Sequence, residues 1–180
     1  MSDSSENRRE TARRRLSLIG VAIAGALFAI VVVTIVLTLM NRETMPSVTA
    51  DTLLQSSMRW DAEGPPSYDI EVMLKKHRVE RHRVEVRDGE VVRYTLDDHE
   101  MTRRRAFDTW SVPGMFGTIE ADVENIRLAE TGKAKPHTPR LTLWGTFDQK
   151  YGIPRRYRRV QWGANFEVSW EVVEFKVVEN

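Results

Sequence analysis

The segment Tyr68–Lys75, with the sequence YDIEVMLK, decides the fold class because an aromatic or aliphatic residue stands at every second position. One face of an extended chain would carry Tyr68, Ile70, Val72 and Leu74, and the other would carry the remaining residues of the segment. Successive side chains of a β-strand point to opposite faces of the sheet. The alternation therefore predicts a strand with one buried and one solvent-facing side.

The residues that follow this strand continue the same period. Val84 and Val86 alternate with charged residues, and Asp88-Gly89 then supplies the two residues of a hairpin turn. Asp and Gly suit such a turn because they tolerate positive φ angles. Val92, Tyr94 and Leu96 would share one side of the returning strand. This part of the chain therefore predicts a three-stranded antiparallel meander, followed by a loop over Asp97–Arg105.

Two helices are predicted, one on each side of the meander in the sequence. The first would be capped by Thr49 or Asp51 and would end at Gly64-Pro65-Pro66, and the second would be capped by Thr109 or Ser111. Apolar residues at spacings of three and four give each helix a buried stripe. The stripe of the first comprises Leu53, Leu54, Met58 and Trp60, and that of the second comprises Val112, Phe116, Ile119, Val123 and Ile126, with Glu120, Asp122 and Glu124 on its outer face.

Three further strands are predicted near the C-terminus, over 141–147, 157–162 and 166–177. In the last of them the apolar phase moves from Phe166, Val168, Trp170 and Val172 to Val173, Phe175 and Val177. A change of parity within a strand predicts a bulge or bend near Val172. The full pattern predicts an α+β fold, in which an antiparallel sheet of about six strands carries two helices on one face.

The run Leu16–Met40 (LSLIGVAIAGALFAIVVVTIVLTLM) holds 25 residues without a charge, enough for a helix that crosses a bilayer. Five arginines precede the run and only Arg42 follows it closely, so we expect a cytoplasmic N-terminus and an external C-terminal domain. A cleaved signal peptide is the alternative, but its apolar part usually has about 7–15 residues. The predicted organisation is a disordered basic tail (1–15), a membrane helix (16–40), a spacer (41–48) and an extracytoplasmic α+β domain (49–180).

The composition excludes several classes of function. The 27 Lys and Arg residues nearly balance the 26 Asp and Glu residues, so nothing in the overall charge predicts a nucleic-acid partner. Because the chain has no cysteine, it cannot use disulfides, thiolate metal sites or a thiol nucleophile. No nucleophile elbow, His-Glu-x-x-His motif or glycine-rich phosphate loop is present. We therefore expect no cofactor and no catalytic residue that sequence motifs can identify.

Four segments resemble a bacterial family of exported or membrane-anchored domains of unknown function. They are Trp60 with Ser67-Tyr68, Val84–Val91 (VEVRDGEV), Thr109–Ile119 and Phe147–Pro154 (FDQKYGIP), the last being similar to the family signature FDxxYGYP. The resemblance covers Trp60–Trp162 and implies a shared fold, without an assigned activity. The family often has cysteines in the first hairpin, which this chain lacks, and Ile153 stands where an aromatic residue is usual.

The candidate binding residues lie in one C-terminal stretch and are Trp144, Tyr151, Arg155, Arg156, Arg158 and Arg159. By parity Trp144 falls on the polar face of its strand, so it should be the most exposed tryptophan. Parity also places Arg156 and Arg158 on one face of a strand and Arg155 and Arg159 on the other. Such a basic run could bind an anionic group, or it could protect an edge strand from aggregation. Tyr151 could stack on a ligand, or belong to a turn made by Gly152 and Pro154.

The candidate metal ligands are Asp97, Asp98, His99 and Glu100, a run that offers three carboxylates and one imidazole. The run lacks the ligand spacing of a calcium-binding loop, and its alternative interpretation is a solvated loop.

The sequence as a whole predicts a single-pass protein of the bacterial cytoplasmic membrane that presents a non-catalytic binding or scaffolding domain. Its expected partners are membrane lipid, through Leu16–Met40, and an envelope protein, lipid or polymer. Two alternatives remain open. The chain could be a subunit of a membrane complex held through its transmembrane helix, or an enzyme whose site is not visible in the sequence.

Overall fold

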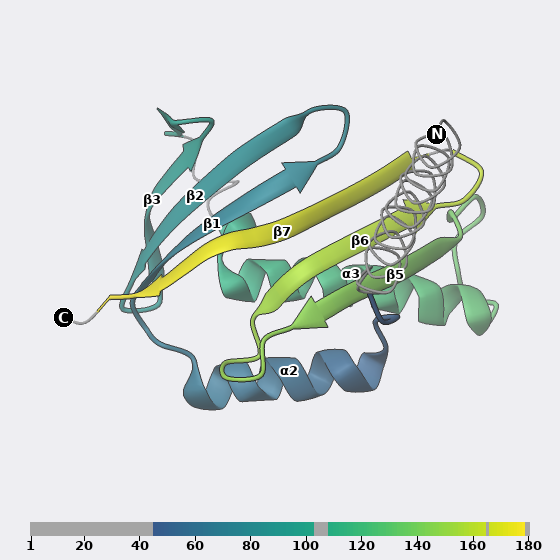
Figure 1. Ribbon diagram of the computed structural model, residues 1–180. Helices are drawn as coiled ribbons and strands as arrows, with labels where there is room; N and C mark the ends of the chain where they lie inside the picture. Colours follow the sequence, from purple (N-terminus) through teal and green to yellow (C-terminus); the bar gives the residue numbers. More distant parts are fainter. Residues whose placement is uncertain (1–44, 103–107, 165, 179–180) are drawn as a thin grey trace, which may run out of the picture. The chain divides into compact units, whose positions relative to one another are not determined.

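The computed structural model describes residues 45–102, 108–164 and 166–178 (Figure 1). The predicted basic tail, the membrane helix Leu16–Met40 and the first residues of the spacer lie outside these residues. Within the described ranges, no helix has both the length and the apolar character needed to cross a membrane.

One antiparallel sheet contains all the strands in the described residues, in the order β4-β3-β2-β1-β7-β6-β5. The α+β class and the antiparallel sheet are thus confirmed, but the sheet has seven strands rather than about six. The additional strand is β4, which forms from the predicted loop because Asp97 and Asp98 adopt positive φ angles of 48° and 67° and reverse the chain. The strands are β1 Tyr68–Lys75, β2 Val79–Arg87, β3 Glu90–Leu96, β4 His99–Glu100, β5 Leu141–Phe147, β6 Pro154–Gln161 and β7 Phe166–Val177.

The two predicted helices are confirmed as α2, Ala50–Glu63, and α3, Val112–Glu130, the latter preceded by the 3₁₀ turn η2, Asp108–Trp110. Thr49 caps α2 through a reciprocal hydrogen-bond pair with Thr52, and the Ser111 hydroxyl caps α3 by accepting the Gly114 amide N–H. A short polar side chain at these positions satisfies amide groups that a helix start leaves unpaired.

The buried stripe of α2 differs from the predicted one. Leu53 and Trp60 are buried, but Leu54 and Met58 are 58% and 61% exposed. Leu53 and Trp60 are seven residues apart and therefore share one helix face, whereas Leu54 and Met58 are rotated by 100° or more from Leu53. Only this narrower stripe of α2 is buried.

Both helices pack on the same face of the sheet, where a single core forms. Tyr68, Ile70, Val72 and Leu74 of β1 are all buried, as the alternation predicted. The indole ring of Trp60 packs edge-on against Tyr68, with 5.4 Å between ring centroids. The Tyr68 hydroxyl in turn accepts the amide N–H of Val112 at the start of α3, and burial raises the pKa of that hydroxyl to about 12.

The predicted bulge in β7 is confirmed. Val72 pairs with Val172 and Glu71 pairs with Glu174, so Val173 is the extra residue, and it is 50% exposed. A second register shift, between β2 and β3, leaves Val92 without a paired residue on β2, and Val92 is 57% exposed. The prediction that Val92 shares the buried side of β3 with Tyr94 was therefore wrong. At each bulge, one apolar side chain leaves the buried face of its strand.

The end of the predicted spacer is an ordered part of the domain. The Val48 amide donates to the Leu143 carbonyl at 3.1 Å, and the Gly145 amide donates to the Pro46 carbonyl at 3.0 Å. Ser47 therefore lies opposite Trp144 and covers part of the outer edge of β5. Residues 46–48 therefore pair with β5 before α2 begins.

Candidate functional site: the open face of the sheet

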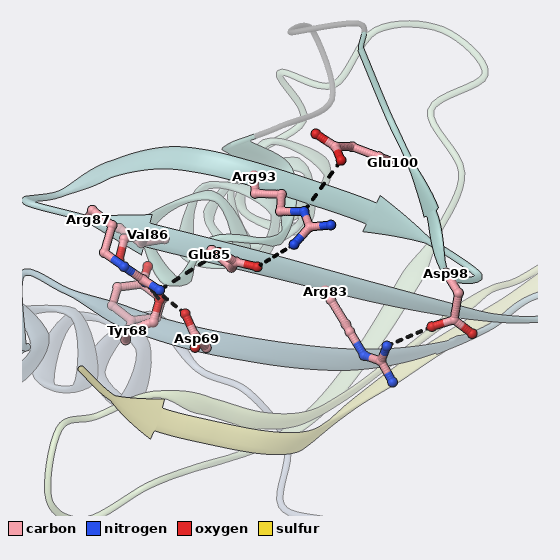
Figure 2. Close-up of polar contacts among 9 residues, drawn as sticks. All are labelled: Tyr68, Asp69, Arg83, Glu85, Val86, Arg87, Arg93, Asp98 and Glu100. Atoms are coloured by element: carbon pink, nitrogen blue, oxygen red, sulfur yellow. Dashed lines mark hydrogen bonds and ion pairs between the residues drawn. The ribbon is translucent and has the colours of Figure 1, made fainter.

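The side chains of the strands that point away from α2 and α3 form the open face, which no described helix covers. Its β1–β3 part is a set of ion pairs (Figure 2). The Arg87 guanidinium donates to Asp69 Oδ1 at 2.7 Å and also to the carbonyl oxygens of Tyr68 and Val86. Glu85 lies 3.8 Å from Arg87 Nη2 and 3.4 Å from Arg93 Nη1, so its carboxylate joins two strands.

The same set of ion pairs extends to both sides of Glu85. Arg83 Nη1 donates to Asp98 Oδ1 at 2.6 Å, and Arg93 Nε lies 3.5 Å from Glu100 (Figure 2). Glu71 of β1 pairs with Arg83 and, at 3.3 Å, with Arg81. Each carboxylate faces an arginine on a neighbouring strand or turn, which is the arrangement that favours cross-strand pairing.

The β5–β7 part of the open face pairs the predicted arginines. Arg156 Nε donates to Glu171 at 3.0 Å, and Arg158 makes two hydrogen bonds, of 2.7 and 3.0 Å, to the two Glu167 oxygens. The hydrogen bond from Arg158 holds the pKa of Glu167 below its usual value. The Arg158 guanidinium also lies 5.3 Å from the centre of the Trp144 ring, a cation–π arrangement.

Two predictions about this part need correction. Trp144 does lie on the polar face, but it is half-buried beneath Arg158, and Trp162 at 58% is the exposed tryptophan of the described residues. The basic strand β6 is not an edge strand, because it lies between β5 and β7. The parity prediction is confirmed for three of the four arginines, since Arg156 and Arg158 face away from the helices while Arg159 faces α3. Arg155 lies at a register shift between β5 and β6 and has no residue opposite it on β5.

On the covered face, Arg159 belongs to a buried polar cluster with Asp122 and Tyr157. Arg159 Nη1 donates to the two Asp122 oxygens at 2.9 and 3.2 Å, and the Tyr157 hydroxyl donates to Asp122 at 2.8 Å. Asp122 is only 4% exposed, so its predicted place on the outer face of α3 was wrong. Burial, together with the Asp122 carboxylate, raises the pKa of the Tyr157 hydroxyl. Asp122 follows the core residue Ile119 by three positions, a spacing that already places it on the buried stripe.

A second buried polar group was not predicted at all. His82 of β2 is 4% exposed and stacks against Trp110, with 4.4 Å between ring centroids. Its Nδ1 lies 2.8 Å from the Tyr94 hydroxyl, and its Nε2 lies 3.6 Å from Glu80. Burial lowers the pKa of His82, which favours the neutral imidazole.

Tyr151 belongs to the turn between β5 and β6. The Asp148 carboxylate accepts the amide N–H groups of Lys150 and Tyr151, and the Tyr151 ring packs against Phe175 at 6.1 Å between centroids. Gly152 has a φ of 76°, and a Cβ there would lie 2.2 Å from the Ser56 carbonyl oxygen. The structure therefore places Tyr151 in a tight turn packed against α2 and β7.

A groove of about 340 Å³ lies between α2 and the C-terminal end of β5. Its lining is mixed, with Gln55 and Arg59 of α2 on one side and Thr146, Phe147 and Gln149 on the other. Arg59 spans the groove and donates to the Gln149 carbonyl at 2.7 Å. This hydrogen bond bridges the groove, so its polar groups are partly satisfied internally.

The candidate metal ligands do not converge. Asp98 and Glu100 pair with arginines, Asp97 accepts the Arg81 amide N–H, and His99 Nδ1 lies 2.8 Å from the Asp97 carbonyl. Across the described ranges, no three His, Asp or Glu side chains are grouped so that they could hold a metal ion. Guanidinium groups thus neutralise Asp98 and Glu100, and a backbone amide satisfies Asp97.

No model of a protein family matches the chain, and no curated protein matches it. The resemblance to exported domains of unknown function therefore stays a prediction.

Proposed function

We propose that this chain is a single-pass protein of a bacterial cytoplasmic membrane, with its N-terminus in the cytoplasm. Its external α+β domain is a non-catalytic binding or scaffolding domain that docks a protein on the open face of the sheet. The uncharged run Leu16–Met40 and the arginines before it support the anchor and its direction.

The accessibility of the open-face ion pairs is the observation that carries the docking proposal. The Arg156 and Glu171 side chains are 42% and 45% exposed, and those of Arg158 and Glu167 are 44% and 49% exposed. Exposed pairs of this kind contribute only about 0–1 kcal/mol each to stability. They can therefore exchange an internal partner for one on another protein at little cost. Asp122 and His82, by contrast, are buried among internal partners.

The open face also offers apolar contact area between its charges. Trp144 lies under Arg158, and the bulge turns Val173 outward. Arginine and aromatic residues are enriched at protein interfaces, where complementary charges fix the register of the partner. The partner we propose is a protein with acidic and basic side chains at strand-like spacing.

Site-specific crosslinking of the full chain in intact membranes tests this proposal. A photo-reactive residue at Ser169, which lies on the open face between Glu167 and Glu171 and opposite Arg158, should capture one protein. The same residue at Ala121, on the exposed side of α3, should not. A double swap, Arg156→Glu with Glu171→Arg, keeps the internal ion pair but reverses the charge pattern. Loss of the Ser169 capture in the folded double swap supports docking by charge pattern.

The opposite results would reject the proposal. Equal capture from Ser169 and Ala121, or capture that the double swap leaves unchanged, excludes docking through the open-face charges. Replacement of Leu16–Met40 by an unrelated transmembrane segment tests the alternative that the chain is a subunit of a membrane complex. If that replacement abolishes the capture, the chain is held in a complex through its transmembrane helix.

A further inference from the structure

Three connections that are far apart in the sequence meet at one end of the sheet. They are the β1–β2 turn, the β6–β7 turn and the connection from α3 to β5 (Figure 1). The antiparallel register brings them together, because Lys75 pairs with both Val79 and Ser169, and Gln161 pairs with both Phe166 and Leu141. We refer to the described residues of these three segments, 75–78, 133–140 and 161–166 without residue 165, as the basic end.

The basic end carries positive charge without acidic residues of its own. Its three segments contain no Asp or Glu, and their Lys and Arg residues are all exposed. Arg78 pairs with Glu80 of β2 at 2.7 Å, which offsets one of these charges. The basic residues are Lys75, Lys76, Arg78, Lys133, Lys135 and Arg140.

The opposite end of the sheet has the opposite character. Asp61 and Glu63 close α2 there, and Asp88 and Glu90 flank the β2–β3 turn, which a hydrogen bond from Gly89 to the Pro66 carbonyl ties to the start of β1. All four acidic residues are exposed. The domain is therefore polarised along its strands, and an anionic surface would attract one end and repel the other.

Aromatic side chains lie among the basic residues. Trp162 is 58% exposed, and its indole N–H donates to the Thr142 hydroxyl at 2.8 Å, which fixes the orientation of the ring. Lys76 Nζ lies 5.3 Å from the centre of the Phe166 ring. An exposed tryptophan beside lysine and arginine is the combination that membrane interfaces favour.

We propose that the basic end lies on the anionic phospholipid surface of the membrane that anchors the chain, an inference that rests on the proposed anchor. Only four residues, Asn41–Thr44, separate the uncharged run from Met45. The five residue steps from Met40 to Met45 span at most about 18 Å when the chain is fully extended. The next residues are hydrogen-bonded along β5. The tether thus keeps the domain at the headgroups at a high effective concentration, where each lysine and arginine of the basic end attracts anionic lipid.

The contact can be measured in the full chain reconstituted into vesicles, because the absence of cysteine allows single-site labelling. An environment-sensitive fluorophore on Ala164→Cys reports the basic end, and the same fluorophore on Glu63→Cys reports the acidic end. One set of vesicles contains phosphatidylcholine alone, and the other contains equal parts of phosphatidylcholine and phosphatidylglycerol. We expect a blue shift and quenching by lipid-borne quencher at Ala164→Cys in the phosphatidylglycerol vesicles only, and neither effect at Glu63→Cys.

Charge variants and salt identify the cause of the contact. Reversal of Lys76, Lys135 and Arg140 to Glu should reduce the quenching at least threefold, and high salt should reduce it as well. Lys176→Glu, at the other end of β7, is the matched control and should leave the quenching unchanged.

Other outcomes overturn the inference, and one of them separates it from the anchor. Equal signals in both kinds of vesicle, or no signal at Ala164→Cys, show that the basic end does not recognise anionic lipid. If the chain nevertheless resists alkaline extraction, the anchor stands and only this inference fails. If alkali extracts the chain, the anchor itself fails. A response at Ala164→Cys that requires added envelope proteins indicates an acidic protein partner instead of lipid.

Discussion

Removal of the Asp122 carboxylate should destabilise the domain strongly, because two other groups depend on it. In Asp122→Ala the buried Tyr157 hydroxyl loses its acceptor, at a cost of about 1–3 kcal/mol. Arg159 loses its counter-ion, and an unpaired cation costs about 3–5 kcal/mol when fully buried. The Arg159 side chain is 28% exposed and can turn toward water, which reduces that cost. We expect a total loss of about 3–4 kcal/mol.

Urea unfolding of the full chain in detergent, followed by tryptophan fluorescence, measures this loss. Tyr157→Phe removes only one hydrogen bond to the charged group and should cost about 1.5–2 kcal/mol. Glu124→Ala, two residues further along α3, breaks an exposed pair with Arg127 and should change the midpoint little. If Asp122→Ala is no more destabilising than Glu124→Ala, the buried cluster does not have the structural role that we assign to it, and Arg159 returns to the list of binding candidates.

Four further predictions concern single residues. Because burial depresses the pKa of His82, the unfolded state binds more protons than the folded state just below pH 6.5. Unfolding experiments should therefore show that the free energy of unfolding decreases as the pH is lowered through this range, and His82→Gln should flatten that slope. Gly117→Ala should raise the free energy of unfolding by about 0.5–1 kcal/mol, because the exposed helical site has open space for a methyl group. Gly145→Ala should lower the free energy of unfolding by about 1–3 kcal/mol, because a Cβ would lie 2.9 Å from Val48 Cγ2 and 3.0 Å from the Arg156 carbonyl oxygen. It should also speed proteolysis of residues 46–48, which pair with β5 at this position. Arg158→Ala should cost less than about 1 kcal/mol but shift tryptophan emission to the red, because it uncovers Trp144.

The sequence alone determined the local features of this protein. Alternation over Tyr68–Lys75 marked the central strand and its buried side, and the change of parity near Val172 marked the bulge. The capping residues of both helices were among the pairs that the sequence offered. Such features depend on neighbours within a few residues, because the helical and strand periods act over that range. The charge-free run Leu16–Met40 is a local feature of the same kind, and it supports the anchor independently of the fold.

Only the tertiary structure decided the order of the strands and what that order brings together. It placed the basic strand β6 inside the sheet rather than at its edge, and it turned Asp122 toward Tyr157 and Arg159, which follow it by more than thirty residues. The basic end likewise collects three turns separated by long stretches of chain. No local pattern contains these contacts, because they arise from strand pairing between distant segments, which is chosen by the packing of the whole core.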